Sequence, residues 1–195
     1  DIKALRNILS VAKSIFCIDF KADPFHSNRG IYGDALSAFS MIGKEKIYEL
    51  APDVYQFLNC NDKVFRETAV TTLGLSTRLH LPEFKDIAYK IWLEDKDGIV
   101  RNAALRAWTS YYSNSQDKEV LKTLYKILLN ENYPIADRRV AMQDIFYVSG
   151  ETPKFYDPFQ DKHLYLLKSH EEFNKKIDWD EIKAIMKKYA PNALI

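Results

Sequence analysis

A motif that occurs twice between residues 62 and 108 limits the folds open to this chain more than any other feature. Each copy has Asp, Arg and Ala at relative positions 0, 4 and 7, and a large apolar residue at position 11. The copies are Asp62, Arg66, Ala69 and Leu73, then Asp97, Arg101, Ala104 and Trp108. A weaker third copy keeps Arg138, Ala141 and Ile145. The first two arginines are 35 residues apart, which is the spacing of repeat units and not of helical turns.

Apolar residues recur at helical spacing around these motifs, and no strand-like alternation of useful length occurs. Helices are expected over 1–18, 31–41, 64–78, 99–112, 136–148 and from Trp179 onward. The first helices of three pairs are expected to start near Ala51-Pro52, Leu81-Pro82 and Asp117, since Pro and Asp favour helix starts. The sequence therefore predicts an all-helical chain built from helix pairs.

The pattern changes after Gly150. Residues 151–163 contain two prolines and three aromatic residues, which predicts an ordered loop. Helical stripes return at Leu164, Leu166, Leu167 and Phe173, and Asp178 is expected to cap the last helix. Terminal units of a repeat array are usually atypical because one of their faces meets water. Residues 151–195 are therefore interpreted as an atypical C-terminal cap on a single domain that spans residues 1–195.

Composition excludes several classes of protein. Apolar residues make up 47% and charged residues 28% of the 195 residues, which is typical of a globular domain and not of a disordered chain. The formal net charge is +1, so no global field draws in nucleic acid or an anionic membrane. No apolar run reaches the 18 or so residues of a membrane span.

The two cysteines, Cys17 and Cys60, are too few for a disulfide scaffold. Each is expected to be a small buried apolar residue in preference to a disulfide partner or a reactive thiol. The first residues lack the pattern of a signal peptide, although the sequence starts with Asp and a removed leader stays an open alternative. A cytoplasmic location is the default expectation.

Helix pairs with Asp in the turn and Val-Arg at the start of the second helix resemble HEAT repeats, especially the short bacterial type. The resemblance covers residues 50–148. It is weaker at both ends, and Pro134 stands in the third copy where the turn Asp belongs. The period of 35 to 37 residues is also shorter than that of typical HEAT units, and the tetratricopeptide and ankyrin motifs are absent. The resemblance implies an armadillo-like α-α superhelix whose second helices line a concave, partner-binding face.

The motif residues also have a direct physical interpretation. The alanines allow close approach of helices, and Leu73 and Trp108 fill the interior one turn further on. Asp and Arg four residues apart can pair with each other or form a ladder between neighbouring units. The resemblance favours a structural role for Arg66 and Arg101 over a role in ligand recognition.

No catalytic constellation is predicted. The four histidines, His26, His80, His163 and His170, show no metal-ligand spacing. The pair His170-Glu171 resembles one element of the HEAT-repeat metal hydroxylases, but a solvated helix face is the favoured interpretation. Phosphate-binding loops, nucleophile elbows and Cys-x-x-Cys motifs are absent. No cofactor and no metal are therefore predicted.

The alternative enzyme class is a HEAT-like DNA glycosylase or another nucleic-acid-binding protein. That function needs a basic concave face with aromatic side chains near a flipped base. Trp92 and Trp108 are available, but both lie on apolar stripes and are expected in the core. The near-zero net charge also makes nucleic acid an unfavoured partner.

The favoured function is a non-catalytic protein-interaction module, either an adaptor or a dedicated inhibitor of the immunity-protein type. Alignment of the units by their motif arginines predicts rows of partner-binding residues along the second helices. These residues are Glu67, Thr71, Asn102, Arg106, Arg139, Gln143 and Tyr147. Arg and Tyr are enriched at interaction hot spots, although an ordinary solvated surface is an equal alternative for any single one of these side chains.

Overall fold

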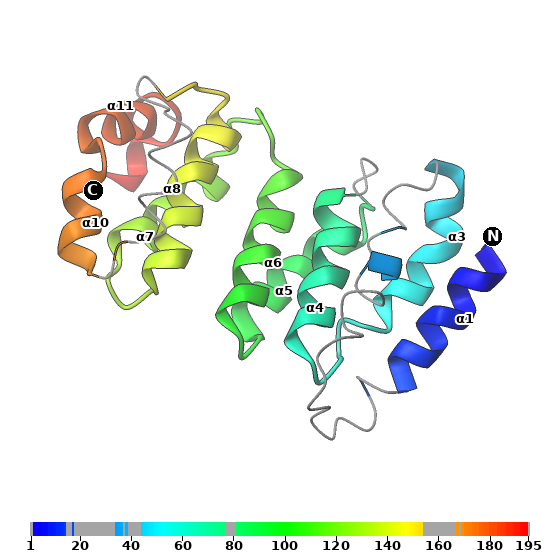
Figure 1. Ribbon diagram of the computed structural model, residues 1–195. Coiled ribbons are helices and arrows are strands. Elements are labelled where there is room, and N and C mark those ends of the chain that lie inside the picture. The colour runs from blue at the N-terminus through cyan, green and yellow to red at the C-terminus, as the bar shows by residue number, and fades with distance from the viewer. Residues whose placement is uncertain are drawn as a thin grey trace. The chain divides into compact units, whose positions relative to one another are not determined.

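The computed structural model describes residues 2–14, 17, 34–36, 38, 44–76, 81–153, 167 and 169–194 (Figure 1). Its helices are α1 (Ile2–Lys13), α3 (Lys44–Tyr55), α4 (Lys63–Thr71), η4 (Thr72–Ser76), α5 (Phe84–Glu94), α6 (Gly98–Ser110), α7 (Lys118–Leu129), α8 (Ile135–Ser149), α10 (His170–Lys176), α11 (Trp179–Tyr189) and η5 (Pro191–Ala193). No strand occurs in these ranges, so the all-helical prediction is confirmed. The superhelical arrangement of HEAT-like pairs stays a prediction.

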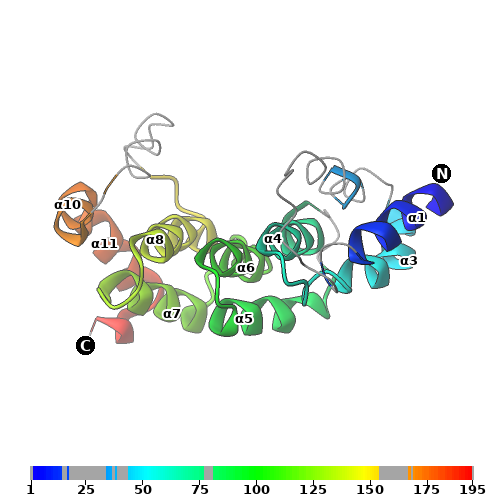
Figure 2. The same ribbon diagram turned by 60° about the horizontal axis from the view of Figure 1, so that its bottom comes forward.

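The chain divides into two compact units, unit 1 (Asp1–Trp108) and unit 2 (Thr109–Ile195). In unit 1, α4 and α6 lie side by side, and α5 packs along one side of both (Figures 1 and 2). Helix α1 lies alongside α3, and Arg6 of α1 pairs with Asp53 of α3 at 2.8 Å. The single domain expected over residues 1–195 stays a prediction.

The core of unit 1 is formed by the inward faces of these helices. Its fully buried large side chains include Leu50, Phe57, Phe65, Leu73 and Phe84. Gly74 in η4 has no room for a side chain: an added Cβ would meet Ala107 of α6 and would stand 3.0 Å from the ring of Phe84. Glycine is therefore what allows η4 to approach α6 closely.

Cys17 and Cys60 form a disulfide across 43 positions of sequence, within unit 1. The expectation of two separate buried thiols is wrong. The pairing depends on the packing of α1 against α3, which brings the segment after α1 to the turn between α3 and α4, and sequence spacing carries no sign of it. Cysteine usage consequently no longer supports the cytoplasmic default, because disulfides persist mainly in oxidising compartments.

In unit 2, α7 and α8 form an antiparallel pair against which α11 packs. The side chains buried in this core include Leu121, Leu124, Ile145, Phe173 and Met186. Helix α8 ends at Gly150, whose φ of 76° is left-handed, as is usual for a glycine that follows a helix. The loop before α7 covers this end, since the backbone N–H groups of Asn114 and Gln116 donate to the carbonyls of Tyr147 and Val148.

Most of the expected helices are observed. Asp62, Asp117 and Asp178 cap α4, α7 and α11 through their carboxylates, because each accepts from backbone N–H groups of the first turn. One expected start is wrong: α3 begins at Lys44, and Pro52 lies near its end. Pro52 is exposed, and its carbonyl accepts from the Gln56 side chain.

Several other predictions fall outside the described residues in whole or in part. They are the helix over 31–41, of which Asp34 to Leu36 are helical, the loop over 151–163 and the stripe at 164–166. Leu36 is fully buried. Leu167 is described but is not helical, so the helix expected around it begins only at His170.

Candidate functional site

The repeated motif divides into inward positions and outer positions. Its inward apolar members, Ala69, Leu73, Ala104, Trp108, Ala141 and Ile145, are all buried. The outer positions lie one and five residues after each motif arginine, and also nine residues after Arg138 at Tyr147, and they carry the side chains of the candidate surface. The arginines themselves are occupied within the fold.

Arg66 joins two turns of unit 1. Its Nη1 donates to the carbonyls of Cys60 and Asn61, at 2.8 and 3.0 Å. These two bonds provide donors for backbone carbonyls in the turn that follows α3. Its Nε and Nη2 donate to the two carboxylate oxygens of Asp95, at 2.8 and 3.0 Å. Burial alone raises the pKa of Asp95, but the Arg66 bonds and the Asp97 N–H outweigh burial and hold the pKa below its usual range.

Ion pairs of Arg66 and of Asp97 connect neighbouring helix pairs in unit 1, but each joins a motif residue to a residue outside the motif and not a motif Asp to a motif Arg. Arg66 binds Asp95 in the next turn, and Lys63 pairs with Asp97 at 3.2 Å. Arg101 repeats the behaviour of Arg66 by donating to the Asp95 carbonyl at the end of α5, 3.0 Å away. The structural role expected for Arg66 and Arg101 is confirmed. Asp95 is the partner that the motif alignment missed, and its only sequence signal is its place in the turn.

Arg138 plays the equivalent part in unit 2 with other partners. Its Nε donates to the Leu128 carbonyl near the end of α7, at 2.7 Å. Its Nη1 lies 2.8 Å from Nδ1 of His170, and its Nη2 donates to Oδ1 of Asn174 at 2.6 Å. The guanidinium also stands 5.0 Å above the ring of Phe173. Desolvation by burial lowers the pKa of Arg138, while Glu131 opposes this shift.

His170 consequently has a structural partner. Arg138 can only donate, so Nδ1 of His170 is the acceptor and the ring proton is on Nε2. Glu171 points to a different neighbour, since it pairs with Lys175 one turn further along the exposed face of α10. No group of three potential metal ligands occurs anywhere in the described ranges.

The four outer residues of unit 1 come from adjacent helices. Glu67 and Thr71 lie on α4, Asn102 and Arg106 lie on α6, and all four are partly exposed. Burial raises the pKa of Glu67, the nearby Asp97 adds to this shift, and Lys63 opposes it. Glu67 is thus a half-buried carboxylate in an environment that disfavours its charge.

The three outer residues of unit 2 lie on α8 and differ in exposure. Tyr147 is 46% exposed and Gln143 is partly exposed, whereas Arg139 is only 9% exposed. Tyr147 is well placed on a fixed backbone, because its carbonyl accepts from Asn114. Arg139 offers a partner much less surface than Tyr147 does.

Trp92 and Trp108 lie in the core, as predicted. They are 4% and 7% exposed, and their rings stack with centroids 6.1 Å apart. The ring of Tyr89 packs against both indoles, with its centroid 5.5 Å from that of Trp92 and 4.9 Å from that of Trp108. Neither indole presents a face on which a nucleobase can stack.

Among the described helices, none has the length and apolar character that crossing a membrane requires. Comparisons with protein-family models, with curated proteins and with solved structures give no match to this chain. The likeness to HEAT repeats therefore stays an expectation that rests on the motif residues.

Proposed function

We propose that this chain is a non-catalytic protein-interaction module that binds a protein partner through the outer positions of its second helices. The observation that carries the proposal is the division of the repeat motif. Its arginines, alanines and large apolar residues hold the helix pairs together, while Glu67, Thr71, Asn102 and Arg106 stay partly exposed at matched positions of α4 and α6. Repeat scaffolds commonly use such matched rows for recognition.

The mixed charge of these rows supports a protein partner. Glu67 and Arg106 have opposite sign, Thr71 and Asn102 are neutral, and Tyr147 of unit 2 adds an exposed aromatic ring. Protein interfaces combine polar rims with Arg and Tyr anchors, whereas nucleic-acid interfaces are strongly basic. An adaptor and a dedicated inhibitor both fit this description. A cytoplasmic location is compatible with either, provided that the disulfide of unit 1 forms there.

The test begins with affinity capture from the lysate of the source cell, in DNase-treated and untreated arms, followed by mass spectrometry. A stoichiometric protein partner that survives DNase is expected. Its dissociation constant is then measured for Arg106→Glu and Tyr147→Ala. Each is expected to weaken binding at least about tenfold, as interface hot spots do, and the two together should abolish capture.

Matched variants control for general damage. Lys90→Glu reverses an exposed charge on α5, and Tyr48→Ala removes a tyrosine of α3 that is 52% exposed. Both controls should leave affinity unchanged, and circular dichroism should show intact helices in all four variants. Unchanged affinity in the Arg106 and Tyr147 double variant would contradict the assignment. Salt-dependent retention of nucleic acid without a protein partner would favour the alternative function.

A further inference from the structure

We propose that the Cys17–Cys60 disulfide is a redox-sensitive latch that holds helix α1 on unit 1, and that a dithiol reductant releases it. The proposal is independent of the partner-binding function, because it concerns α1 and the turn after α3. It rests on three observations: what the disulfide joins, which described contacts hold α1, and which cysteine is exposed to a reductant.

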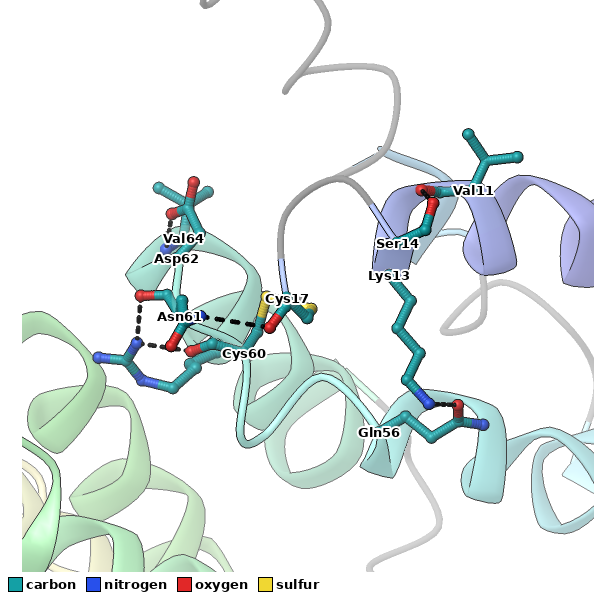
Figure 3. The surroundings of a disulfide bond; sticks show 10 residues. Val11, Lys13, Ser14, Cys17, Gln56, Cys60, Asn61, Asp62 and Val64 are labelled. Carbon is teal, nitrogen blue, oxygen red and sulfur yellow. Dashed lines mark hydrogen bonds between the residues drawn. A yellow bond between two sulfur atoms is a disulfide. The ribbon is translucent and has the colours of Figure 1, made fainter. Parts of the chain in front are cut away.

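The disulfide joins the segment after α1 to a turn that is tied into the repeat (Figure 3). Asn61 donates from Nδ2 to the Cys17 carbonyl at 3.3 Å. The carbonyls of Cys60 and Asn61 both accept from Arg66, which in turn holds Asp95. The Cys60 side is thus anchored by bonds to Arg66 that do not depend on the disulfide, whereas Cys17 stands in the segment that directly follows α1.

Helix α1 also meets unit 1 through described side chains. Leu9 and Ala12 are its buried side chains among residues 3–13, while Ile8 and Val11 are 38% and 47% exposed. Its described polar contacts with α3 include those of Arg6, which pairs with Asp53 and Glu49, and of Lys13, which bonds to Gln56. Exposed ion pairs of this kind contribute little to stability. The disulfide is the covalent attachment beside these contacts, and we expect it to contribute more stability than the ion pairs do.

Release follows ordinary thiol–disulfide exchange. Cys60 is 2% exposed and Cys17 is partly exposed, so a thiolate of the reductant attacks Sγ of Cys17. The Cys17–Cys60 bond breaks, a mixed disulfide forms on Cys17, and the Cys60 thiolate takes up a proton. The second thiol of the reductant then displaces Cys17, which is protonated in turn. Two electrons pass to the protein, and the dithiol leaves as a disulfide.

The test is hydrogen–deuterium exchange by mass spectrometry on the full chain, with and without dithiothreitol. Alkylation of the freed thiols by iodoacetamide measures how far reduction has gone. Reduction should accelerate amide exchange in α1 at least about tenfold. An acceleration of this size corresponds to the loss of only part of the stability that a disulfide closing a long loop provides. Peptides from α7, α8 and α11 in unit 2 should exchange at unchanged rates.

The Cys17→Ser, Cys60→Ser double variant is the matched control. It should show the fast exchange of α1 without reductant and no further change with it. Three results would overturn the proposal: unchanged exchange of α1 after complete reduction, equal acceleration of both units, or resistance of the folded protein to dithiothreitol. Since the wild-type measurement does not use the variant, a poorly folding variant leaves the test intact.

Discussion

Arg66 in unit 1 and Arg138 in unit 2 occupy the same motif position but meet different chemistry. Each is buried, and each donates to a backbone carbonyl at or just beyond the end of the first helix of its pair. Arg66 then pairs with a carboxylate, through two bonds to Asp95. Arg138 instead meets the neutral groups of His170 and Asn174 and the ring of Phe173.

The difference shows which part of the motif is general. In each unit the arginine binds backbone carbonyls between the two helices of its pair or in the last turn of the first helix. The remaining donors of the guanidinium bind whatever the next element offers. In unit 1 that element is another repeat turn with its own Asp, and in unit 2 it is the atypical helix α10. The contribution of each arginine to the free energy of unfolding therefore depends on the groups that the next element places beside it.

The largest effect is expected from Arg66→Met, which leaves the part-buried carboxylate of Asp95 without its guanidinium partner. Loss of one partner of a buried ion pair typically lowers the free energy of unfolding by about 3–5 kcal/mol. Urea denaturation followed by tryptophan fluorescence measures it, since Trp92 and Trp108 belong to unit 1. Addition of Asp95→Asn should recover part of the loss, and a double variant less stable than Arg66→Met would contradict the pairing.

Arg138→Met should have a smaller effect, because the groups it leaves behind are neutral. The acceptors at Leu128, His170 and Asn174 lose their donor, but the removal of a buried charge offsets part of that cost. The expected loss is about 2–3 kcal/mol, read from the fluorescence of Trp179, whose Nε1 donates to the Asn174 carbonyl. Arg138→Lys should recover only part of it, because an ammonium group lacks the planar fork. A loss above that of Arg66→Met would overturn the comparison.

The features that the sequence predicts correctly are those with local causes. Asp62 and Asp117 cap helices through bonds to residues two or three positions away, so their role is visible in a short window. The buried Trp92 and Trp108 follow from the apolar stripes in the same way. The turns around the motif arginines are likewise local.

The features that the sequence misses depend on tertiary contact. Cys17 meets Cys60, and Arg138 meets His170, only because separate helices pack together. The helix start predicted at Pro52 is wrong for a related reason. Pro52 is exposed and lies inside α3, and the residue type alone does not indicate whether a proline is exposed. Among the candidate residues, the burial of Arg139 is also set by packing and not by its place in the repeat.

The Arg66–Asp95 pair should also make unit 1 sensitive to acid. The folded pKa of Asp95 lies below its unfolded value, so its contribution is present at neutral pH and is lost as pH falls through the folded pKa. Asp95→Asn should therefore lower the free energy of unfolding by about 1–2 kcal/mol at pH 7. Below the folded pKa of Asp95 the difference should disappear, because the protonated carboxyl and the amide are then both uncharged at this site. A difference that is independent of pH would show that the amide disturbs packing instead.

Glu67→Gln should change stability least and in the opposite direction. The folded pKa of Glu67 is raised, first by burial and then by Asp97, so its charge opposes folding once pH rises above the unfolded value. Replacement by the neutral amide should therefore stabilise unit 1 by a few tenths of a kcal/mol at pH 7, with solvent screening limiting the gain. Urea denaturation at pH 7 and pH 4 measures it, and the gain should shrink at the lower pH.

The same substitution separates folding from recognition at the candidate surface. Asp95 and Glu67 are both acidic residues of unit 1, but removal of charge is expected to weaken the fold at one and to strengthen it at the other. Within the fold Lys63 offsets only part of the cost of the Glu67 charge, and we expect a partner to supply a further favourable interaction, as for residues of binding sites that reduce stability. Glu67→Gln should consequently stabilise the free protein and weaken partner binding. If it stabilises the protein and leaves affinity unchanged, Glu67 lies outside the interface and the binding surface is reduced to Thr71, Asn102 and Arg106 in unit 1.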